Sequence, residues 1–326
     1  MPGRRSPHAP CFQRSRGGGL VTALGVTPPP ATGLSLCVLA SGSSGNCSVL
    51  VSRPDETGPR RVVLLDAGLS PRRTQRLLAE RGIRPDEVDD ILFTHLDTDH
   101  CHSGWTSAFR PGGWRARLRI HRRHLGRAER AGLLFRHTEV FEDTLDLGTG
   151  LDARAMLMSH DDLGVAVFRL RADTPAGDAH LGFATDLGHT TDELIASLRG
   201  VDALAIESNY CPIMQHESDR PAFLKQRITG GAGHLSNTES AQAARRIGPR
   251  ECLILLHLSR QCNTPVRALR EHAGCGCEVH VTNQHRPTPW FTIRGGAPRC
   301  AVPAPPRCPR TLFDLVSEPP TRTVAP

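Results

Sequence analysis

Four side chains that readily bind metal ions lie within six residues of one another, in the sequence THLDTDH at positions 94–100. They are His95, Asp97, Asp99 and His100. The apolar segment 90–94 leads into them and is predicted to be a strand, so these side chains fall in the turn at its end. Carboxylates and imidazoles this close repel one another or compete unless a cation lies among them. A polar surface turn is the alternative, but this spacing after a strand favours a metal site.

Further candidate ligands follow other predicted strands. Each is a single acid or histidine where an apolar segment ends, which taken alone is often only a hydrogen-bonded residue. They are Asp66 after 61–65, His160 after 153–158, Asp186 after 181–184 and His257 after 252–256. Five such strand ends are hard to explain as surface turns, and a site with two metal ions needs this many donors. We therefore expect the strand ends to converge on one metal centre.

The elements that must position these residues are many strands with a few helices between them. Apolar segments predict strands at 34–40, 47–52, 61–65, 90–94, 153–158, 165–170, 181–184, 203–207, 251–257, 279–281 and 290–293. Helices are expected after Ser70, which precedes a proline, and at 191–198, 220–227, 236–247 and 264–273. The helix at 236 opens with a capping box, Ser236 to Glu239. This order predicts stacked sheets with helices outside, in the α/β or α+β class.

Composition limits the class of protein. The chain has 326 residues, of which 38% are hydrophobic and 22% charged, which excludes collagen, coiled coils and wholly disordered chains. No apolar run approaches the roughly 18 residues that a membrane helix needs. The 11 cysteines are an odd number without a CxxC pair, which is typical of cytoplasmic thiols rather than a disulfide framework. We therefore expect a globular cytoplasmic protein and no membrane partner.

The formal charge of +7 suggests a nucleic-acid partner, but most of it lies outside the predicted fold. Residues 1–33 carry four arginines and no acid, and residues 295–326 carry four arginines and two acids. We predict that 1–33 is a disordered basic tail and that 295–326 is a disordered proline-rich tail. The single folded domain, 34–294, is then nearly neutral, so bulk charge says little about the partner.

The order of these motifs resembles the metallo-β-lactamase superfamily, over about residues 34–294. The resemblance rests on Asp66-Ala67-Gly68, His95-x-Asp97-x-Asp99-His100, His160, Asp186 and His257. It implies a four-layer αββα sandwich with a dinuclear metal site at one edge of its sheets. Further motifs look like the WalJ/YycJ-type branch, cytoplasmic metallo-hydrolases for some of which 5′–3′ exonuclease activity is proposed. These motifs lie at 41–46, 66–70, 207–210, 225–228, 233–237 and 257–259.

The resemblance also implies roles for the candidate ligands. The implied ligands are His95, Asp97 and His160 for one ion, Asp99, His100 and His257 for the other, and Asp186 as the bridge. A hydroxide between the two ions is the implied nucleophile, with Asp99 taking part in catalysis as well as in metal binding. Asp66 is expected to orient a ligand histidine rather than to bind metal.

Asp97 departs from the family pattern, which usually has histidine at this position. An oxygen donor in place of imidazole shifts the preference of the site from Zn²⁺ toward harder ions such as Mn²⁺ or Fe²⁺. The spacing of Asp97 from His95 and Asp99 is unchanged, so we expect it to remain a ligand of one of the two divalent ions. A damaged site without activity is the alternative.

The residues expected to meet the substrate lie around His234. It stands just before the predicted helix at 236, whose free N–H groups are a natural seat for phosphate. We expect His234 to protonate the leaving oxygen or to hold the phosphate, and a packed structural histidine is the alternative. Other residues expected to support the site or to contact substrate are Asn46, Glu207, Asn209, Ser236 and Asn237.

Three functions are open at this point. The favoured one is a metal-dependent phosphodiesterase or nuclease that acts on DNA or RNA ends. The others are a hydrolase of small molecules, such as a cyclic phosphodiester, thioester or lactone, and a non-catalytic binding protein. Arg115, Arg117 and Arg119 alternate along a predicted strand and either follow a nucleic-acid backbone or form an ordinary solvated face. The oligomeric state is left open.

Overall fold

The computed structural model describes residues 26–110, 113–231 and 233–296 and folds them around two seven-stranded β-sheets. The first sheet contains, in spatial order, β14 (Phe291–Ile293), β1 (Gly33–Ala40), β2 (Cys47–Arg53), β3 (Arg61–Leu65), β4 (Asp90–Leu92), β5 (Arg117–His121) and β6 (Thr138–Phe141). The second contains β13 (Glu278–Val281), β12 (Cys252–Leu256), β11 (Ala203–Glu207), β10 (Gly177–Ala184), β9 (Val165–Thr174), β8 (Leu151–Met158) and β7 (Thr144–Gly148).

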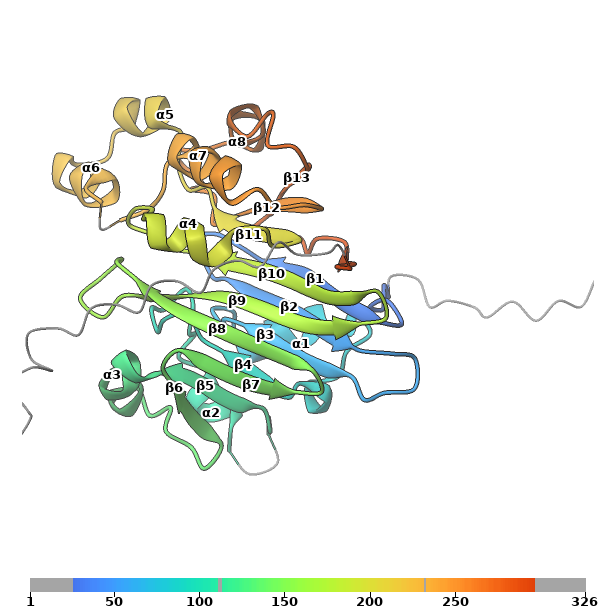
Figure 1. The fold of residues 1–326 in the computed structure, drawn as a ribbon. Helices are drawn as coiled ribbons and strands as arrows, with labels where there is room; N and C mark the ends of the chain where they lie inside the picture. The colour runs from blue at the N-terminus through green and yellow to red at the C-terminus, as the bar shows by residue number, and fades with distance from the viewer. Residues whose placement is uncertain (1–25, 111–112, 232, 297–326) are drawn as a thin grey trace, which may run out of the picture.

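Helices cover the outer face of each sheet, and the two sheets face each other (Figure 1). The helices on the first sheet are α1 (Pro71–Ala79), α2 (Trp105–Ala108) and α3 (Leu125–Arg130). Those on the second are α4 (Asp192–Leu198), α7 (Asn237–Ile247) and α8 (Pro265–Glu271). Between β11 and α7 along the chain come α5 (Pro212–Glu217) and α6 (Ala222–Thr229), and short 3₁₀ helices lie at Pro85–Glu87 and Arg122–His124. The predicted four-layer αββα sandwich is confirmed.

Three buried apolar layers hold the sandwich together. Leu36 of β1 and Phe168 of β9 belong to the layer between the sheets. Leu78 of α1 packs in the layer on the outer face of the first sheet, and Ile247 of α7 packs in the layer on the second. Strands β11 and β12 are buried along their whole length. Burial on both faces explains why these strands read as continuous apolar runs in the sequence.

The strand order brings the carboxyl ends of several strands to one edge. Strands β3 to β6 run parallel in the first sheet, and β10 to β13 run parallel in the second. Strand β8 points the same way as β10, because each pairs antiparallel with β9. Side chains that follow these strands therefore share an edge, which is where open α/β sheets bind their ligands.

The apolar strands and the capped helices occur where the sequence predicts them, but five short elements were not predicted. These are β6, β7, α2, α3 and α5. Both strands have exposed positions and neither carries an apolar run. The three helices have only four to six residues each, fewer than an amphipathic pattern needs to be visible.

The structured part of the chain extends slightly beyond 34–294. The backbone N–H of Thr27 donates to Glu80 O at 3.0 Å, and Trp290 Nε1 donates to Thr27 O at 2.9 Å. At the other end, Gly295 N–H donates to Glu251 Oε1 at 3.0 Å. The remainder of the two predicted tails lies outside the described residues. Within the described ranges, no helix has the length and apolar character needed to cross a membrane.

Arg117 and Arg119 of β5 do not form an exposed basic stripe. Their Nε atoms lie 3.0 and 2.7 Å from Oδ1 of Asp90, a fully buried carboxylate on neighbouring β4. Glu139 of β6 also pairs with both guanidinium groups. These ion pairs neutralise both arginines within the sheet, so the suggestion that the stripe follows a nucleic-acid backbone is wrong.

Candidate metal centre and its cavity

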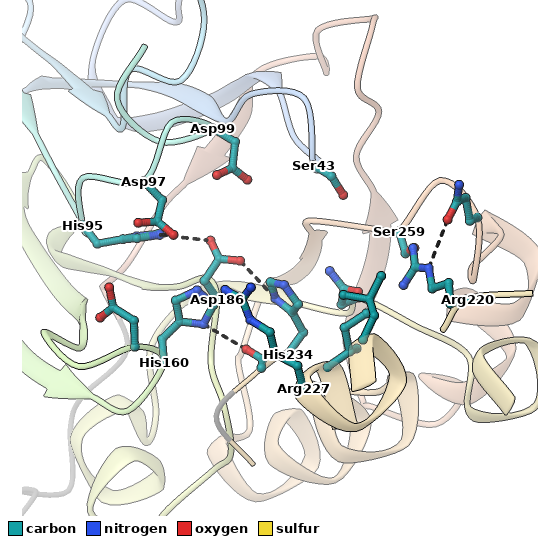
Figure 2. A pocket seen from close by; sticks show the side chains of 16 residues that line it. Ser43, His95, Asp97, Asp99, His160, Asp186, Arg220, Arg227, His234 and Ser259 are labelled. Carbon is teal, nitrogen blue, oxygen red and sulfur yellow. Dashed lines mark hydrogen bonds and ion pairs between the residues drawn. The ribbon is translucent and has the colours of Figure 1, made fainter. Parts of the chain in front are cut away.

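The candidate metal-binding side chains gather at the edge where the strands end. His95, Asp97, Asp99 and His100 lie in the loop that follows β4. Asp66 follows β3, His160 follows β8, Asp186 follows β10 and His257 follows β12. Figure 2 shows His95, Asp97, Asp99, His160, Asp186 and His234 around one cavity. Both sheets therefore contribute to a single site, as the sequence predicts.

Three of these residues have an unusual backbone conformation. The angle φ is 62° at Asp66, 53° at Asp186 and 54° at His257, in the left-handed region that favours glycine. Apart from Thr149, no other non-glycine residue in the described part of the chain has a positive φ. Such a conformation costs about 1–3 kcal/mol and persists only where the surroundings impose it. The strained turns lie at strand ends that supply the site, which marks this edge as functional.

The donor atoms form two groups that meet at Asp186. The first group contains His95, Asp97 and His160, and the second contains Asp99, His100 and His257. Within each group, one nitrogen or oxygen of every member lies within 4.8 Å of the others. Asp186 forms a similar set with His95 and His100, so it stands between the two groups. Mixed imidazole and carboxylate donors of this kind suit divalent ions such as Zn²⁺, Mn²⁺ and Fe²⁺.

Asp186 is a buried acid at the centre of the site. Its Oδ2 contacts His100 Nε2, and its Oδ1 lies 3.2 Å from His234 Nδ1 and 3.3 Å from His257 Nδ1. Burial opposes ionisation, but His257 and His100 hold the pKa of Asp186 well below its usual value. Oδ1 is buried and makes no hydrogen bond of normal geometry within the described chain. An ionised oxygen left in this state fits a position beside a cation.

Neighbouring groups fix the orientation of two site histidines. His100 Nδ1 lies 2.7 Å from Asp66 Oδ2, and Asp66 Oδ1 accepts the backbone N–H of Thr94 at 2.8 Å. His160 Nδ1 donates to Gly233 O at 2.9 Å. A carbonyl oxygen only accepts, so Nδ1 of His160 carries the proton and Nε2 keeps a lone pair for a cation. Asp66 thus orients His100, a candidate metal ligand.

Asn46 and Asn209 contact two further site histidines. Asn46 Nδ2 lies 3.0 Å from His100 Nε2, while its Oδ1 accepts the backbone N–H of Gly42 at 2.8 Å. Asn209 Nδ2 lies 3.0 Å from His257 Nδ1 and donates to His257 O at 2.9 Å. Both amides therefore occupy the supporting positions that the sequence suggested for them.

Asp97 is held by an arginine that the sequence reasoning did not single out. Arg127 of α3 lies 2.6 Å from Asp97 Oδ1, and the same nitrogen lies 3.4 Å from Asp161 Oδ2. The other oxygen, Oδ2, lies 4.0 Å from His95 Nε2. One oxygen of Asp97 therefore pairs with Arg127, and the other lies toward His95, a fellow member of the first donor group. Nothing in the sequence separates Arg127 from the other arginines of the segment 115–130.

His234 forms a charged pair with Glu207 at the end of β11. Its Nδ1 lies 2.7 Å from Glu207 Oε1, while Glu207 Oε2 accepts the backbone N–H groups of Leu187 and Leu235. Burial opposes the charged imidazole, but Glu207 and Asp186 raise the pKa of His234 to about 10. His234 also lines the cavity. The nitrogen that Glu207 does not hold, Nε2, is therefore left for a ligand.

The side chains of Ser236 and Asn237, expected to support the site or to contact substrate, are hydrogen-bonded within the protein and lie outside the cavity lining. Ser236 Oγ caps α7 by accepting Glu239 N–H, and it donates to Glu239 Oε2 at 2.7 Å. Asn237 Oδ1 accepts from Ser208 Oγ and from Asn263 Nδ2 at 2.7 and 2.8 Å. Both side chains are buried and neither lines the cavity. The capping box that made the helix predictable thus also occupies the Ser236 hydroxyl.

The cavity beside the donor groups has a volume of about 290 Å³. The 41–46 loop contributes Ser43 to its lining. The wall opposite His95 and Asp97 was not predicted, and Figure 2 shows Arg220 and Ser259 on that side. This wall comes from the segment around α6 and from the loop after β12, which are far apart in the sequence.

We expect the metal-free protein to lose stability as the pH rises from about 6.5 to about 10. Neighbouring acids, with Asp186 first, raise the pKa of His257 to about 9, and that of His234 reaches about 10. For groups whose pKa is raised by folding, the added stability is full below the unfolded value of 6.5 and vanishes above the folded value. Melting temperatures measured in a chelator across this interval should fall. His234→Gln should flatten that fall, and an unchanged melting temperature in the wild-type protein would contradict the assignment.

Comparison with known proteins gives one family and a consistent set of relatives. The family described as "Beta-lactamase superfamily domain" matches residues 61–258. The chain is 32% identical over 241 residues to the exodeoxyribonuclease WalJ of Streptococcus pneumoniae serotype 2, which covers 71% of this chain and 84% of the relative. It is 27% identical over 273 residues to the exodeoxyribonuclease YycJ of Bacillus anthracis, covering 78% of this chain and 98% of that protein.

A solved structure supports the fold alone. The metallo-β-lactamase fold protein YhfI from Bacillus subtilis superimposes with a TM-score of 0.58 at 17% sequence identity. The match covers 78% of this chain and 99% of that one. The two chains therefore share the sandwich fold.

Proposed function

This chain belongs to the metallo-β-lactamase superfamily, and we propose that it is a metal-dependent phosphodiesterase that removes nucleotides from the ends of DNA. The observation that carries the proposal is the pair of donor groups that share Asp186 at the floor of a cavity. Two relatives named as exodeoxyribonucleases, similar over most of this chain, support DNA as the substrate class.

Two divalent ions are the cofactor in this proposal. One would bind His95, Asp97 and His160, the other would bind Asp99, His100 and His257, and Asp186 would contact both. The buried Asp186 Oδ1, which lacks a hydrogen bond of normal geometry, supports this placement. When bound, such ions acidify water and offset the negative charge on phosphoryl oxygens.

The chain itself supplies a proton donor at the same site. In the metal-free chain, burial opposes the charged imidazole of His234, but Glu207 and Asp186 raise its pKa, which favours the protonated form. Its Nε2 is therefore positioned to protonate the oxygen that leaves when a phosphodiester bond breaks. Glu207 keeps the imidazole in one orientation through Nδ1 and is itself fixed by two backbone N–H groups.

The proposal is tested by incubating Mn²⁺-loaded and Zn²⁺-loaded protein with end-labelled single- and double-stranded DNA and RNA. A cyclic phosphodiester and a thioester run in parallel as small-molecule substrates, and an Asp186→Ala variant is the inactive control. Release of mononucleotides from DNA with a steep decline at higher salt is the expected result. Turnover of the small esters alone, independent of salt, would assign the other class of hydrolase.

Asp97 is expected to favour Mn²⁺ or Fe²⁺ over Zn²⁺. Replacing it with histidine should raise the Zn²⁺ to Mn²⁺ ratio of the purified protein by about tenfold, because imidazole suits Zn²⁺ better than a carboxylate does. Elemental analysis after growth with both metals measures the ratio. Asp161→His is the matched control, since Asp161 shares Arg127 but belongs to neither donor group. A fully active wild-type protein that contains zinc alone would refute this preference.

A further inference from the structure

Two arginines, Arg220 and Arg227, line the cavity together with the candidate metal-binding residues. Arg220 precedes α6 and Arg227 lies in its last turn, and Leu224 and Ile228 of the same helix line the cavity with them. Figure 2 shows Arg220 and Ser259 across the cavity from His95 and Asp97. Both arginines therefore line the cavity of the candidate metal centre, Arg220 across from His95 and Asp97 and Arg227 beside His234 (Figure 2).

Arg220 is held in place without being neutralised. Its Nε donates to Gln261 Oε1 at 3.0 Å, NH1 donates to Gln215 Oε1 at 3.2 Å and NH2 donates to Ser259 Oγ at 3.2 Å. All three acceptors are uncharged, and within the described chain Arg220 makes no ion pair with a carboxylate. A guanidinium has five N–H groups, so these bonds orient the side chain and leave two donors. Its charge is left for an anionic ligand.

Arg227 is close to the metal centre through the backbone. A Cβ atom on Gly233 would overlap the carbonyl oxygens of Arg227 and Ile228, so the end of α6 packs directly against Gly233. Gly233 O in turn accepts the Nδ1 proton of His160. No ion-pair or hydrogen-bond partner for the Arg227 side chain occurs among the described residues, although four carboxylates also line this cavity. Those carboxylates are Asp97, Asp99, Asp161 and Asp186.

We propose that Arg220 and Arg227 form an anion subsite that binds the terminal phosphate of a DNA strand, beside the phosphodiester bond to be cut. This proposal rests on the proposed function and adds that the site selects a phosphorylated strand end. A terminal phosphate monoester carries a charge of about −1.5 to −2 at pH 7, which matches two uncompensated arginines, whereas an internal diester carries one charge. The cavity volume of about 290 Å³ is at the low end for pockets that take one small ligand. It suits the end of a strand better than a strand passing through.

The test compares DNA strands that differ only at their ends. Metal-loaded protein is given the same labelled strand with a 5′-phosphate, with a 3′-phosphate or with hydroxyl groups at both ends, and kcat/KM is measured for each. The wild-type protein should prefer one phosphorylated end over the hydroxyl end by about tenfold, as expected for charge-assisted hydrogen bonds. Arg227→Gln should remove most of this preference by raising KM for the phosphorylated strand, with the hydroxyl strand little changed.

Arg220 also connects the start of α6 to the loop after β12 through its hydrogen bonds to Ser259 and Gln261. Its variants therefore need a measurement, the preference for a phosphorylated end, that a loss of folding stability alone does not change. Arg220→Gln should lower the end preference more than Arg220→Lys does, because lysine retains the charge. Arg270→Gln removes the same charge from an exposed position of α8 outside the cavity and should keep the full preference. An equal loss on phosphorylated and hydroxyl ends would assign Arg220 a structural role and overturn its part in the subsite.

Binding of a phosphorylated dinucleotide, measured by calorimetry, separates the two proposals. If no DNA is cut but the dinucleotide binds and Arg227→Gln weakens the binding about tenfold, the proposed function fails and the subsite stands. If DNA is cut with no preference for either phosphorylated end, the proposed function stands and the subsite is refuted. If neither cutting nor binding is seen, both are refuted.

Discussion

Replacing Asp186 with asparagine should lower kcat for DNA hydrolysis by at least about 10³-fold, a loss of roughly 4 kcal/mol of transition-state stabilisation. Asp186 is the residue shared by the two donor groups, and its Oδ1 is buried without a normal hydrogen bond. Asparagine keeps the shape of the side chain and tolerates a left-handed backbone, so the φ of 53° is retained. The variant therefore removes the negative charge with little other change. Initial rates on end-labelled DNA and metal content by elemental analysis measure the effect.

The matched control for this variant is Asp152→Asn. Asp152 lies on β8 in the same sheet, and its partly exposed carboxylate pairs with Arg171 at 3.0 Å. An exposed pair of this kind contributes about 0–1 kcal/mol to stability, so the control should keep its activity and its metal. Full metal content together with a wild-type rate in Asp186→Asn would remove Asp186 from the centre of the mechanism.

The positions of the candidate ligands could be predicted because they depend on local signals. Each one follows an apolar run that forms a buried strand, and the carboxyl ends of parallel strands meet at one edge of a sheet. The turn after β4 holds four donors, so one strand end alone indicated a cation. The same reasoning explains why Asp186 and His257, single residues far apart in the sequence, could be assigned to the same site.

The partners of these residues could not be predicted, since they are set by tertiary packing. Arg127 reaches Asp97 only because α3 packs beside the loop after β4. Nothing local indicated that Asp66, Asp186 and His257 take positive φ, because none of them is a glycine. The cavity lining with Arg220 and Arg227 was missed for the same reason, as it combines the segment around α6 with the loop after β12.

The binding role of the arginines also depends on where the fold places them and could not be read from the net charge. The net charge of the whole chain suggested a nucleic-acid partner, and the alternating arginines of β5 suggested where it would bind. The structure uses Arg117 and Arg119 to neutralise the buried Asp90. Within the described cavity, Arg220 and Arg227 have no carboxylate partner and are available to an anion, and neither the net charge nor the alternation distinguished them.

Replacing His234 with alanine should lower kcat by about 10²–10³-fold while the metal content stays close to that of the wild-type protein. His234 lies outside both donor groups, and although it clusters with Asp186, Glu207 and His257, its Nδ1 is held by Glu207 at 2.7 Å. Loss of a general acid costs roughly this much, whereas loss of a ligand would also release metal. Rates on DNA and elemental analysis of the same samples separate the two explanations. His189→Ala is the matched control, because His189 is an exposed histidine outside the cavity.

The pH profile gives a second, independent check on His234. A general acid works only while protonated, so wild-type kcat should fall on the alkaline side of the profile where His234 loses its proton, a loss that Glu207 opposes by raising the pKa of His234. In His234→Ala this decline should disappear from the residual rate. Glu207→Gln removes the first-named charge that raises this pKa, so the decline should move to lower pH without a loss of metal. Unchanged turnover in His234→Ala, or a decline that stays in place in Glu207→Gln, would make His234 a packed structural residue instead of the proton donor.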